Sequence, residues 1–316
     1  MSWSQIKKLA SSRAGLLTGA ALAASALTAL WVAAKARQAE RENPPAGSFV
    51  NIDGARIHYV ERGEGPPVVL IHGNTVTLSD FEASGLIDRL AVDHRVIAID
   101  RPGFGRSTRP RDRLWTPSAQ AAMLHEALKR LGVEQPIIVG HSMGTLVALA
   151  MALDHPTDVR SLVLISGYYY PELRVDALLT APVALPVLGD VMRYTVTALS
   201  ARALLQRTVE AMFWPHQVPE QFFPVLSREM MLRPLQIRAN AEDAAFMMPA
   251  AHASSARYSE LRIPVTIVAG ANDKVVDVEA HSRRLHREVP QSELVVVADA
   301  GHMVHYLASD RVIAAV

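Results

Sequence analysis

The sequence predicts a doubly wound α/β domain, in which a parallel sheet is covered by helices on both faces. Two observations carry this prediction. Short, continuously apolar runs recur along the chain, as expected of strands that are buried on both sides. Helix-like stretches separate these runs, for example at residues 117–131 and 279–288, so that strand and helix alternate.

The order of the elements follows from the same pattern. A hairpin is expected first, turning at Asp53-Gly54, because an Asp-Gly pair between two strand-like runs favours a tight β-turn. The later strands are expected at residues 67–73, 95–103, 136–142, 161–167, 264–270 and 294–302. The alternation breaks between Tyr168 and Leu261, where prolines, methionines and aromatics accompany helix-like runs. A mostly helical insertion is the simplest interpretation of that segment.

Three parts are therefore expected. Residues 1–42 are expected to form an N-terminal hydrophobic anchor or signal segment plus linker, and the helix-breaking "RENPPAGS" at 41–48 is interpreted as the linker. The α/β core is expected at 48–167 and 261–316, with a helical cap at 168–260.

The N-terminal segment has the length of a membrane span. Residues 14–34 contain no charged side chain, and at about 1.5 Å per residue such a helix crosses a hydrocarbon layer of about 30 Å. Basic residues flank the segment on both sides, so they give no orientation. The small-x-small sequence at 34–36 also suits cleavage of an export signal. We expect a retained single-span anchor; a cleaved signal peptide and a soluble amphipathic helix are the alternatives.

The composition excludes several classes of function. With 32 basic and 31 acidic residues, the chain lacks the field that a nucleic-acid partner requires. It has no cysteine, which excludes thiolate catalysis, disulfides and Cys-ligated zinc. The Gly-x-Gly at 103–105 lacks the rest of a dinucleotide fingerprint and follows a later strand. Neither an organic cofactor nor a metal is expected.

Ser142 lies at a turn from strand to helix. In "PIIVGHSMGTLVALAMA", residues 136–152, a β-branched run ends at Gly140 and an apolar helix begins at Gly144. A hydroxyl at this turn is held at the tip of a tight bend, and the flanking glycines indicate that backbone passes close by. Whether this serine is a nucleophile depends on what lies beside it.

Chemistry-bearing residues follow other strands of the expected sheet. In parallel α/β sheets, ligands bind beyond the carboxyl ends of the strands. The loops there contain His72-Gly73-Asn74, Asp100-Arg101-Pro102-Gly103, Asn272-Asp273 and Gly301-His302. One edge of the sheet thus gathers a serine, a carboxylate and a histidine. A serine hydroxyl becomes an effective nucleophile when an oriented histidine takes its proton.

With these motifs the chain is similar to the α/β-hydrolase fold superfamily from about residue 48 to its end. The motifs are "HGN" at 72–74, "DRPGFGRS" at 100–107, "GHSMG" at 140–144, "GANDKVVD" at 270–277 and "GHMVH" at 301–305. The resemblance implies a mostly parallel central sheet of about eight strands flanked by helices. It also implies a helical cap insertion, as in serine-nucleophile esterases and lipases.

The resemblance assigns roles to individual residues. Ser142 is expected to be the nucleophile, His302 the general base and then acid, and Asp273 the orienting carboxylate, in the chain order of this superfamily. The oxyanion hole is expected to use the backbone N–H groups of Asn74 and Met143. Asp277 and His305 are the alternatives to Asp273 and His302. The residues expected in supporting roles are His72, His141, Asp100 and Arg101, the last two in the loop after their own strand.

The expected reaction is hydrolysis of a carboxylic ester or related acyl compound through an acyl-enzyme. Haloalkane dehalogenases and epoxide hydrolases share some of these motifs, but they use an aspartate where this chain has Ser142. Perhydrolase, C–C hydrolase, lactonase and acyltransferase reactions stay open on the same triad, as does a non-catalytic binding protein. The apolar cap suggests a small-molecule substrate with an apolar acyl or aryl group, and its methionines are Met230, Met231, Met247 and Met248. The oligomeric state is left open.

Overall fold

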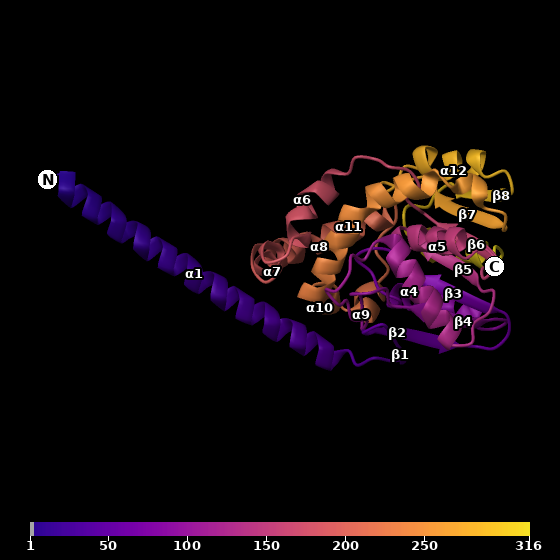
Figure 1. The fold of residues 1–316 in the computed structure, drawn as a ribbon, viewed down its shortest axis with the longest axis horizontal. Coiled ribbons are helices and arrows are strands. Elements are labelled where there is room, and N and C mark those ends of the chain that lie inside the picture. The colour runs from indigo at the N-terminus through magenta and orange to yellow at the C-terminus, as the bar shows by residue number, and fades with distance from the viewer. Residues whose placement is uncertain (1–2) are drawn as a thin grey trace.

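A computed structural model of the chain describes residues 3–316 and has an eight-stranded sheet at its centre (Figure 1). The strands are Ser48–Ile52 (β1), Ala55–Arg62 (β2), Pro67–Ile71 (β3), Arg95–Ile99 (β4), Ile137–His141 (β5), Ser161–Ile165 (β6), Val265–Gly270 (β7) and Ser292–Val297 (β8). Their order across the sheet is β1-β2-β4-β3-β5-β6-β7-β8. The first two pairings, β1 with β2 and β2 with β4, are antiparallel and the other five are parallel. The mostly parallel sheet predicted from the sequence is confirmed.

Both faces of the sheet are buried, which explains why the strands are continuously apolar. In β3, Val69 and Ile71 belong to one hydrophobic cluster, and the alternate residues Val68 and Leu70 belong to a second cluster on the opposite face. All four side chains are fully buried. Successive side chains of a strand point to opposite faces, so a sheet covered on both sides requires apolar residues at every position.

Helices from before and after residues 168–260 in the sequence cover the two faces of the sheet. They are Ser79–Ala83 (α2), Leu86–Leu90 (α3), Pro117–Arg130 (α4), Met143–Asp154 (α5), Arg284–Glu288 (α12), Val304–Leu307 (α13) and Ser309–Ile313 (α14). The start of α4 has a local cause, because the Thr116 side chain accepts a hydrogen bond of 3.1 Å from the N–H of Ala119 and Pro117 follows the cap. Ahead of α12, residues Glu279–Arg283 form a π-helical turn. The helices predicted at 117–131 and 279–288 are confirmed.

A helical insertion lies between β6 and β7. It consists of Val175–Ala184 (α6), Leu188–Met192 (α7), Val196–Phe213 (α8), Phe222–Leu226 (α9), Arg228–Met231 (α10), Pro234–Ser255 (α11) and the short turn Tyr258–Glu260. The predicted insertion is therefore confirmed as helical. In Figure 1 it lies over one end of the sheet, between the core and the N-terminal helix. We call this insertion the cap.

The N-terminal helix Trp3–Glu42 (α1) projects away from the rest of the molecule (Figure 1). Its last turns pack against the cap, where Val32 and Ala39 are buried and Glu40 forms an ion pair of 2.9 Å with Arg233. The helix ends at Glu42, directly before the two prolines of the predicted linker. Among the described residues, this helix alone is long and apolar enough to cross a membrane, over Leu17–Glu42.

A buried ionic network joins the cap to the core. Asp243 of α11 is fully buried and pairs with Arg101 and with Arg109, whose Nη2 lies 2.9 Å from the carboxylate. Gln120 of α4 donates a further hydrogen bond of 3.0 Å to the same carboxylate. Charges removed from water are tolerated only when they are paired and hydrogen-bonded. The network therefore holds α11 in one position over the loop that follows β4.

Candidate active site

Ser142 occupies the sharp turn between β5 and α5, which confirms the strand-to-helix turn predicted there. Its φ is 51° and its ψ is −119°, a conformation that side-chain-bearing residues adopt at a cost of roughly 1–3 kcal/mol. Gly144 allows the turn to pack closely, because a Cβ at this position would lie 2.2 Å from the carbonyl oxygen of Ile71. The half-buried serine thus lies at the carboxyl end of a central strand.

Asp273 and His302 meet at the ends of the two neighbouring strands, β7 and β8. The Nδ1 atom of His302 lies 2.8 Å from Oδ2 of Asp273, and both side chains are buried. The other carboxylate oxygen accepts hydrogen bonds from the N–H groups of Val275, at 2.8 Å, and Val276, at 3.0 Å. Because the carboxylate is held on both oxygens, it fixes the plane and the tautomer of the imidazole, leaving Nε2 of His302 free to act as a base.

His141 connects the serine turn to the histidine loop. Its Nε2 lies 3.3 Å from the backbone oxygen of His302, and the two rings are 5.1 Å apart between centroids. Ser142 is the next residue along the chain, and within the described part its hydroxyl makes no hydrogen bond. Serine and histidine are often beyond hydrogen-bond distance in an unliganded site and close on substrate. The structure therefore brings Ser142, His302 and Asp273 to one edge of the sheet.

A second carboxylate lies beneath this arrangement. Asp80 of α2 is fully buried, and its Oδ2 is 3.0 Å from Nε2 of His305 and 3.7 Å from Nδ1 of His141. Tyr306 donates a hydrogen bond of 2.9 Å to the other oxygen. Burial, followed by the neighbouring His305 and His302, holds the pKa of His141 well below its usual value, so this ring stays neutral.

The same three residues, Asp80, His141 and His305, place ligand-type atoms within 4.8 Å of one another. This is the chemistry of a metal site, but both carboxylate oxygens already accept hydrogen bonds from Tyr306 and His305. We therefore interpret the group as a hydrogen-bonded support that ties α2 and α13 to the serine turn.

The loop at residues 72–74 lies directly against the Ser142 turn. A Cβ on Gly73 would come within 2.9 Å of the Cβ of Ser142, so glycine is required for this approach. The Nε2 atom of His72 accepts a hydrogen bond of 3.0 Å from the N–H of Arg101, and its Nδ1 therefore carries the proton that it donates to the Gly73 oxygen at 2.7 Å. The ring is thus fixed in one tautomer, and its hydrogen bond to Gly73 shapes the turn that leads into Asn74.

Arg101 holds this loop from behind. The fully buried guanidinium donates from Nε to the His72 oxygen at 2.8 Å, and from Nη2 to the Gly73 oxygen at 3.0 Å. A further bond of 2.7 Å from Nη2 fixes the side-chain oxygen of Asn74. The sequence predicted that Arg101 supports the loop after its own strand. The structure shows that it reaches the loop after β3 and the cap as well, a contact that local sequence gives no signal for.

The two alternative residues lie elsewhere. Asp277 accepts a hydrogen bond of 2.7 Å from the N–H of Ala280, so it caps the π-helical turn. His305 is hydrogen-bonded through Nε2 to Asp80, whereas it is His302 that is bonded to Asp273. Asp100 has the supporting contact expected of it, since its carboxylate accepts a bond of 2.9 Å from the N–H of Arg106 in the loop after its strand.

Apolar side chains of the cap meet the loops that carry these polar residues. One buried cluster joins the α8 residues Val209 and Met212 to Val76, after the 72–74 loop, and to Met303, directly after His302. A second cluster joins Met143 to partly buried Met247 of α11. Of the other methionines noted in the sequence, Met231 lies in the first cluster and Met248 is exposed. The surroundings of the turn are therefore largely apolar.

A hollow of about 550 Å³ opens beside the loop that contains Asp273. It is lined by Glu172, Leu173, Arg174, Asp273, Lys274, Val275 and Asp277. Arg174 closes one wall by donating a hydrogen bond of 2.8 Å to the Val275 oxygen. The segment that leads from the core into α6 and the loop that contains Asp273 thus border the same hollow.

The fold and this geometry define a class of protein: an α/β domain with a strained serine turn, a histidine–carboxylate pair and an adjacent backbone loop. Residues 66–309 match the family described as "alpha/beta hydrolase fold", and the chain belongs to that family.

Its relatives differ in chemistry. The 2-hydroxymuconate semialdehyde hydrolase of Pseudomonas putida is 28% identical over 273 residues, which cover 86% of this chain and 93% of the relative. Lipase 1 of Psychrobacter immobilis is 25% identical and covers 84% of this chain and 80% of the relative. Among solved structures, a membrane phospholipase A described as a bacterial virulence factor superposes with a TM-score of 0.66. It has 21% identity and covers 98% of this chain and 96% of its own.

The buried His72 predicts a loss of stability in acid. Burial, then the charge of Arg101, lowers its pKa to about 4, whereas an unfolded histidine titrates near 6.5. The unfolded state therefore binds the extra proton first, and stability falls as the pH drops from 6.5 towards 4. Between pH 7 and pH 5 this one group removes about 2 kcal/mol from the free energy of unfolding.

The measurement is urea unfolding of the full chain in mild detergent at both pH values. His72→Gln is expected to lose about 2 kcal/mol less than the unaltered chain over this interval, whatever its stability at pH 7. His252→Gln, at an exposed position of α11, is the control and keeps the original pH dependence. An unchanged pH dependence in His72→Gln contradicts the assignment.

Proposed function

We propose that the protein is a serine hydrolase that cleaves a carboxylic ester or related acyl substrate through an acyl-enzyme. Ser142 is the nucleophile, His302 the general base and then acid, and Asp273 the orienting carboxylate. The observation that carries the proposal is the 2.8 Å hydrogen bond between His302 and Asp273 at the same sheet edge as the strained Ser142 turn. Such a pair activates a serine hydroxyl without a metal or an organic cofactor.

The reaction begins when His302 takes the proton of Ser142 as its oxygen attacks the acyl carbon. The tetrahedral oxyanion is held by the backbone N–H groups of Met143 and Asn74. Met143 is the first residue of α5, where amide groups have no partner inside the helix and the helix dipole favours negative charge. His302 then protonates the leaving group, and water attacks the acyl-enzyme with His302 as base. Removal of one oxyanion donor of this kind costs about 10²–10³ in rate.

An apolar acyl group is favoured by the surroundings of the turn. The clusters around Met143 and Met303 place cap side chains against the polar loops, with Met247 and Met212 among them. Methionine adapts its shape, so such a lining suits flexible apolar chains. The similarity to Lipase 1 is consistent with an acyl ester substrate.

Cleavage of a carbon–carbon bond is the second candidate. The relative from Pseudomonas putida is named as a 2-hydroxymuconate semialdehyde hydrolase, and its similarity extends over 86% of this chain. A serine nucleophile at the strand-to-helix turn serves both ester hydrolysis and C–C cleavage. Dehalogenation and epoxide opening would instead leave an alkyl ether on the serine, which an activated water does not hydrolyse readily. An ester of an apolar acid and a vinylogous 1,5-diketone are therefore the substrates that distinguish the two candidates.

The site of action is proposed to be a membrane surface, with α1 retained as a single span. Four of the leucines of α1, Leu17, Leu22, Leu27 and Leu30, are exposed, as expected of a helix whose partner is lipid. The structural similarity to a membrane phospholipase A extends over 98% of the chain and so includes α1. A cleaved signal peptide remains the alternative.

Replacement of the nucleophile is expected to abolish ester hydrolysis. With p-nitrophenyl esters of increasing acyl length, Ser142→Ala lowers kcat about 10⁴-fold or more, because only binding and the oxyanion donors are left. Ser161→Ala is the matched control, since Ser161 begins β6 at the opposite edge of the sheet, and it keeps full activity. Turnover that survives in Ser142→Ala refutes the proposal. Hydrolysis of the diketone alone, with the same dependence on Ser142, selects the second candidate.

Two variants test whether Asp273, and not Asp277, is the carboxylate that orients His302. Asp273→Asn replaces the acceptor for Nδ1 of His302 with an amide and so favours the wrong tautomer, which lowers kcat about 10³–10⁴-fold. Asp277→Asn leaves activity unchanged, since an asparagine oxygen still caps Ala280. Rates measured on the best ester decide between them, and the opposite ranking assigns the role to Asp277.

A further inference from the structure

Outside α1, the largest group of exposed apolar side chains near one another in the sequence lies on and between two cap helices, α6 and α7. From α6 into α7, residues 177–189 carry no charged side chain, although only Val183 and Gly189 of this segment are buried. Exposed leucines and valines on and between α6 and α7 include Leu178, Leu179, Leu185, Val187, Leu188 and Val191. We call this set the apolar cap face. A contiguous exposed apolar surface of this kind on a folded domain marks a contact with a protein or a membrane.

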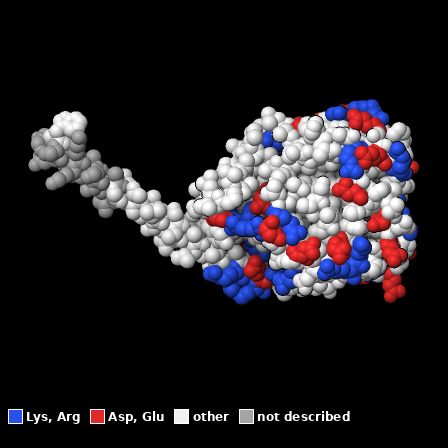
Figure 2. Space-filling model, viewed as in Figure 1, with Lys and Arg blue, Asp and Glu red and all other residues white. Residues whose placement is uncertain are grey.

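This face lies on the same side of the molecule as the free part of α1. In Figure 2 the surface over α6, on the side towards α1, is almost free of charged side chains. Charged groups border it at α7, where Asp190 pairs with Arg111 and Arg193. Two contacts fix the position of α1 relative to the cap. The Arg202 guanidinium of α8 lies 5.0 Å from the ring centre of Trp31, and Glu40 pairs with Arg233.

The boundary between the free and the packed part of α1 is sharp. Leu22, Leu27 and Leu30 are largely exposed, whereas Val32 is buried against the cap. Trp31 and Lys35 stand at this boundary, and tryptophan with a nearby lysine is typical of the surface region of a bilayer. A bilayer that contains α1 up to Trp31 therefore ends at the level of α8, next to the apolar cap face.

We propose that the apolar cap face inserts into the surface of the lipid bilayer that α1 enters, so that the cap, and not the α/β core, faces the membrane. The proposal rests on the retention of α1 as an anchor. Lipid is favoured over a second copy of the chain because the face lies on the side of the molecule on which the exposed, apolar part of α1 projects, and because residues 177–189 bring no charge that would have to leave water on insertion.

Insertion at this face also orients the site. The start of α6 is joined to the Asp273 loop by the hydrogen bond from Arg174 to Val275, and both border the same hollow. A lipid-like substrate then reaches the cleft from the bilayer surface without crossing water. The docking itself is independent of catalysis and is tested without a substrate.

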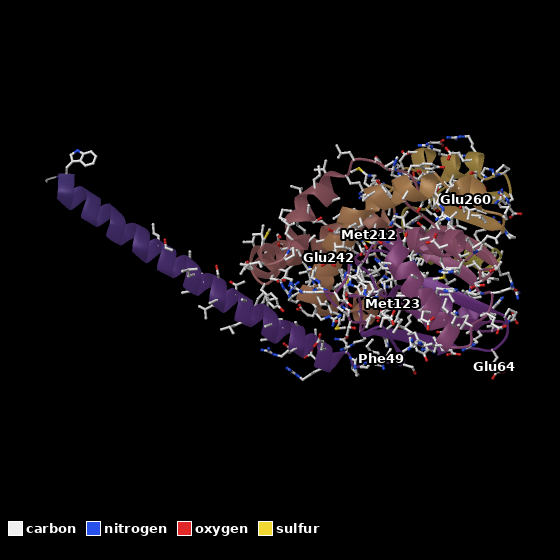
Figure 3. All side chains as sticks on the ribbon, viewed as in Figure 1. Phe49, Glu64, Met123, Met212, Glu242 and Glu260 are labelled. Atoms are coloured by element: carbon white, nitrogen blue, oxygen red, sulfur yellow. The ribbon has the colours of Figure 1, made fainter. Side chains whose placement is uncertain are left out.

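The absence of cysteine allows a direct test. Three variants of the full chain, L179C, L22C and V92C, each receive one environment-sensitive fluorophore. They are placed in phosphatidylcholine–phosphatidylglycerol vesicles that carry nitroxides both near the top and near the end of the acyl chains. Leu179 and Val92 are matched in exposure, at 75% and 76%. Val92 is chosen because it lies far from α1. Its neighbour Asp93 contacts Gly65, and the adjacent Glu64 lies at the end of the domain farthest from α1 (Figure 3).

The proposal predicts a blue shift and nitroxide quenching for the L179C and L22C labels, and neither change for V92C. If the L22C label is quenched and the L179C label is not, α1 is a membrane anchor but the apolar cap face does not insert, and the docking proposal is overturned. If L22C is not quenched, the anchor itself is wrong and the docking proposal falls with it. Disulfide-linked dimers of unlabelled L179C under oxidising conditions, together with no quenching of the labelled L179C by lipid, assign the face to a second copy of the chain and also overturn it. None of these results depends on whether Ser142 is a nucleophile.

Discussion

The arrangement of the site depends on one buried guanidinium, that of Arg101. A guanidinium has five N–H donors, and burying it costs several kcal/mol unless all of them are used. Here they go to the backbone oxygens of His72 and Gly73, the side-chain oxygen of Asn74, and the side chains of Gln120 and Asp243. Only one relative position of the 72–74 loop, α4 and α11 satisfies all five. A single residue therefore sets the loop proposed to hold the oxyanion and locks the cap above it.

The opposite side of the serine turn is held in the same manner by a buried anion. Asp80 is bonded by His305 and Tyr306, while His141 joins the turn to the backbone of His302. Between these two networks Ser142 keeps a strained backbone that no local preference supports. Rigid surroundings of this kind let hydrogen-bond donors point at developing charge before the reaction begins, which is the main source of rate in acyl transfer.

Local pattern was sufficient for part of this structure. The strands follow from short β-branched runs, the turn at Ser142 from its two glycines, and the insertion from the loss of alternation after Tyr168. The contacts of Arg101 and Asp243 could not be predicted, because 142 positions separate them in the sequence and only the folded cap brings them together. Asp80 carries no motif, and its position is set by the packing of α2 on α13. The packing of α1 on the cap is likewise a tertiary contact. The sequence therefore predicted an apolar helix but not its position relative to the cap.

The most direct test of the account is the reaction of the full chain with a fluorophosphonate, followed by peptide mapping. A phosphonate forms a stable adduct only with a serine that is activated by a base and faces oxyanion donors. We expect a single adduct, on the peptide that contains Ser142, and its loss in His302→Ala. A folded protein that forms no adduct, or that is labelled at a different serine, contradicts the assignment of this site as a hydrolase centre.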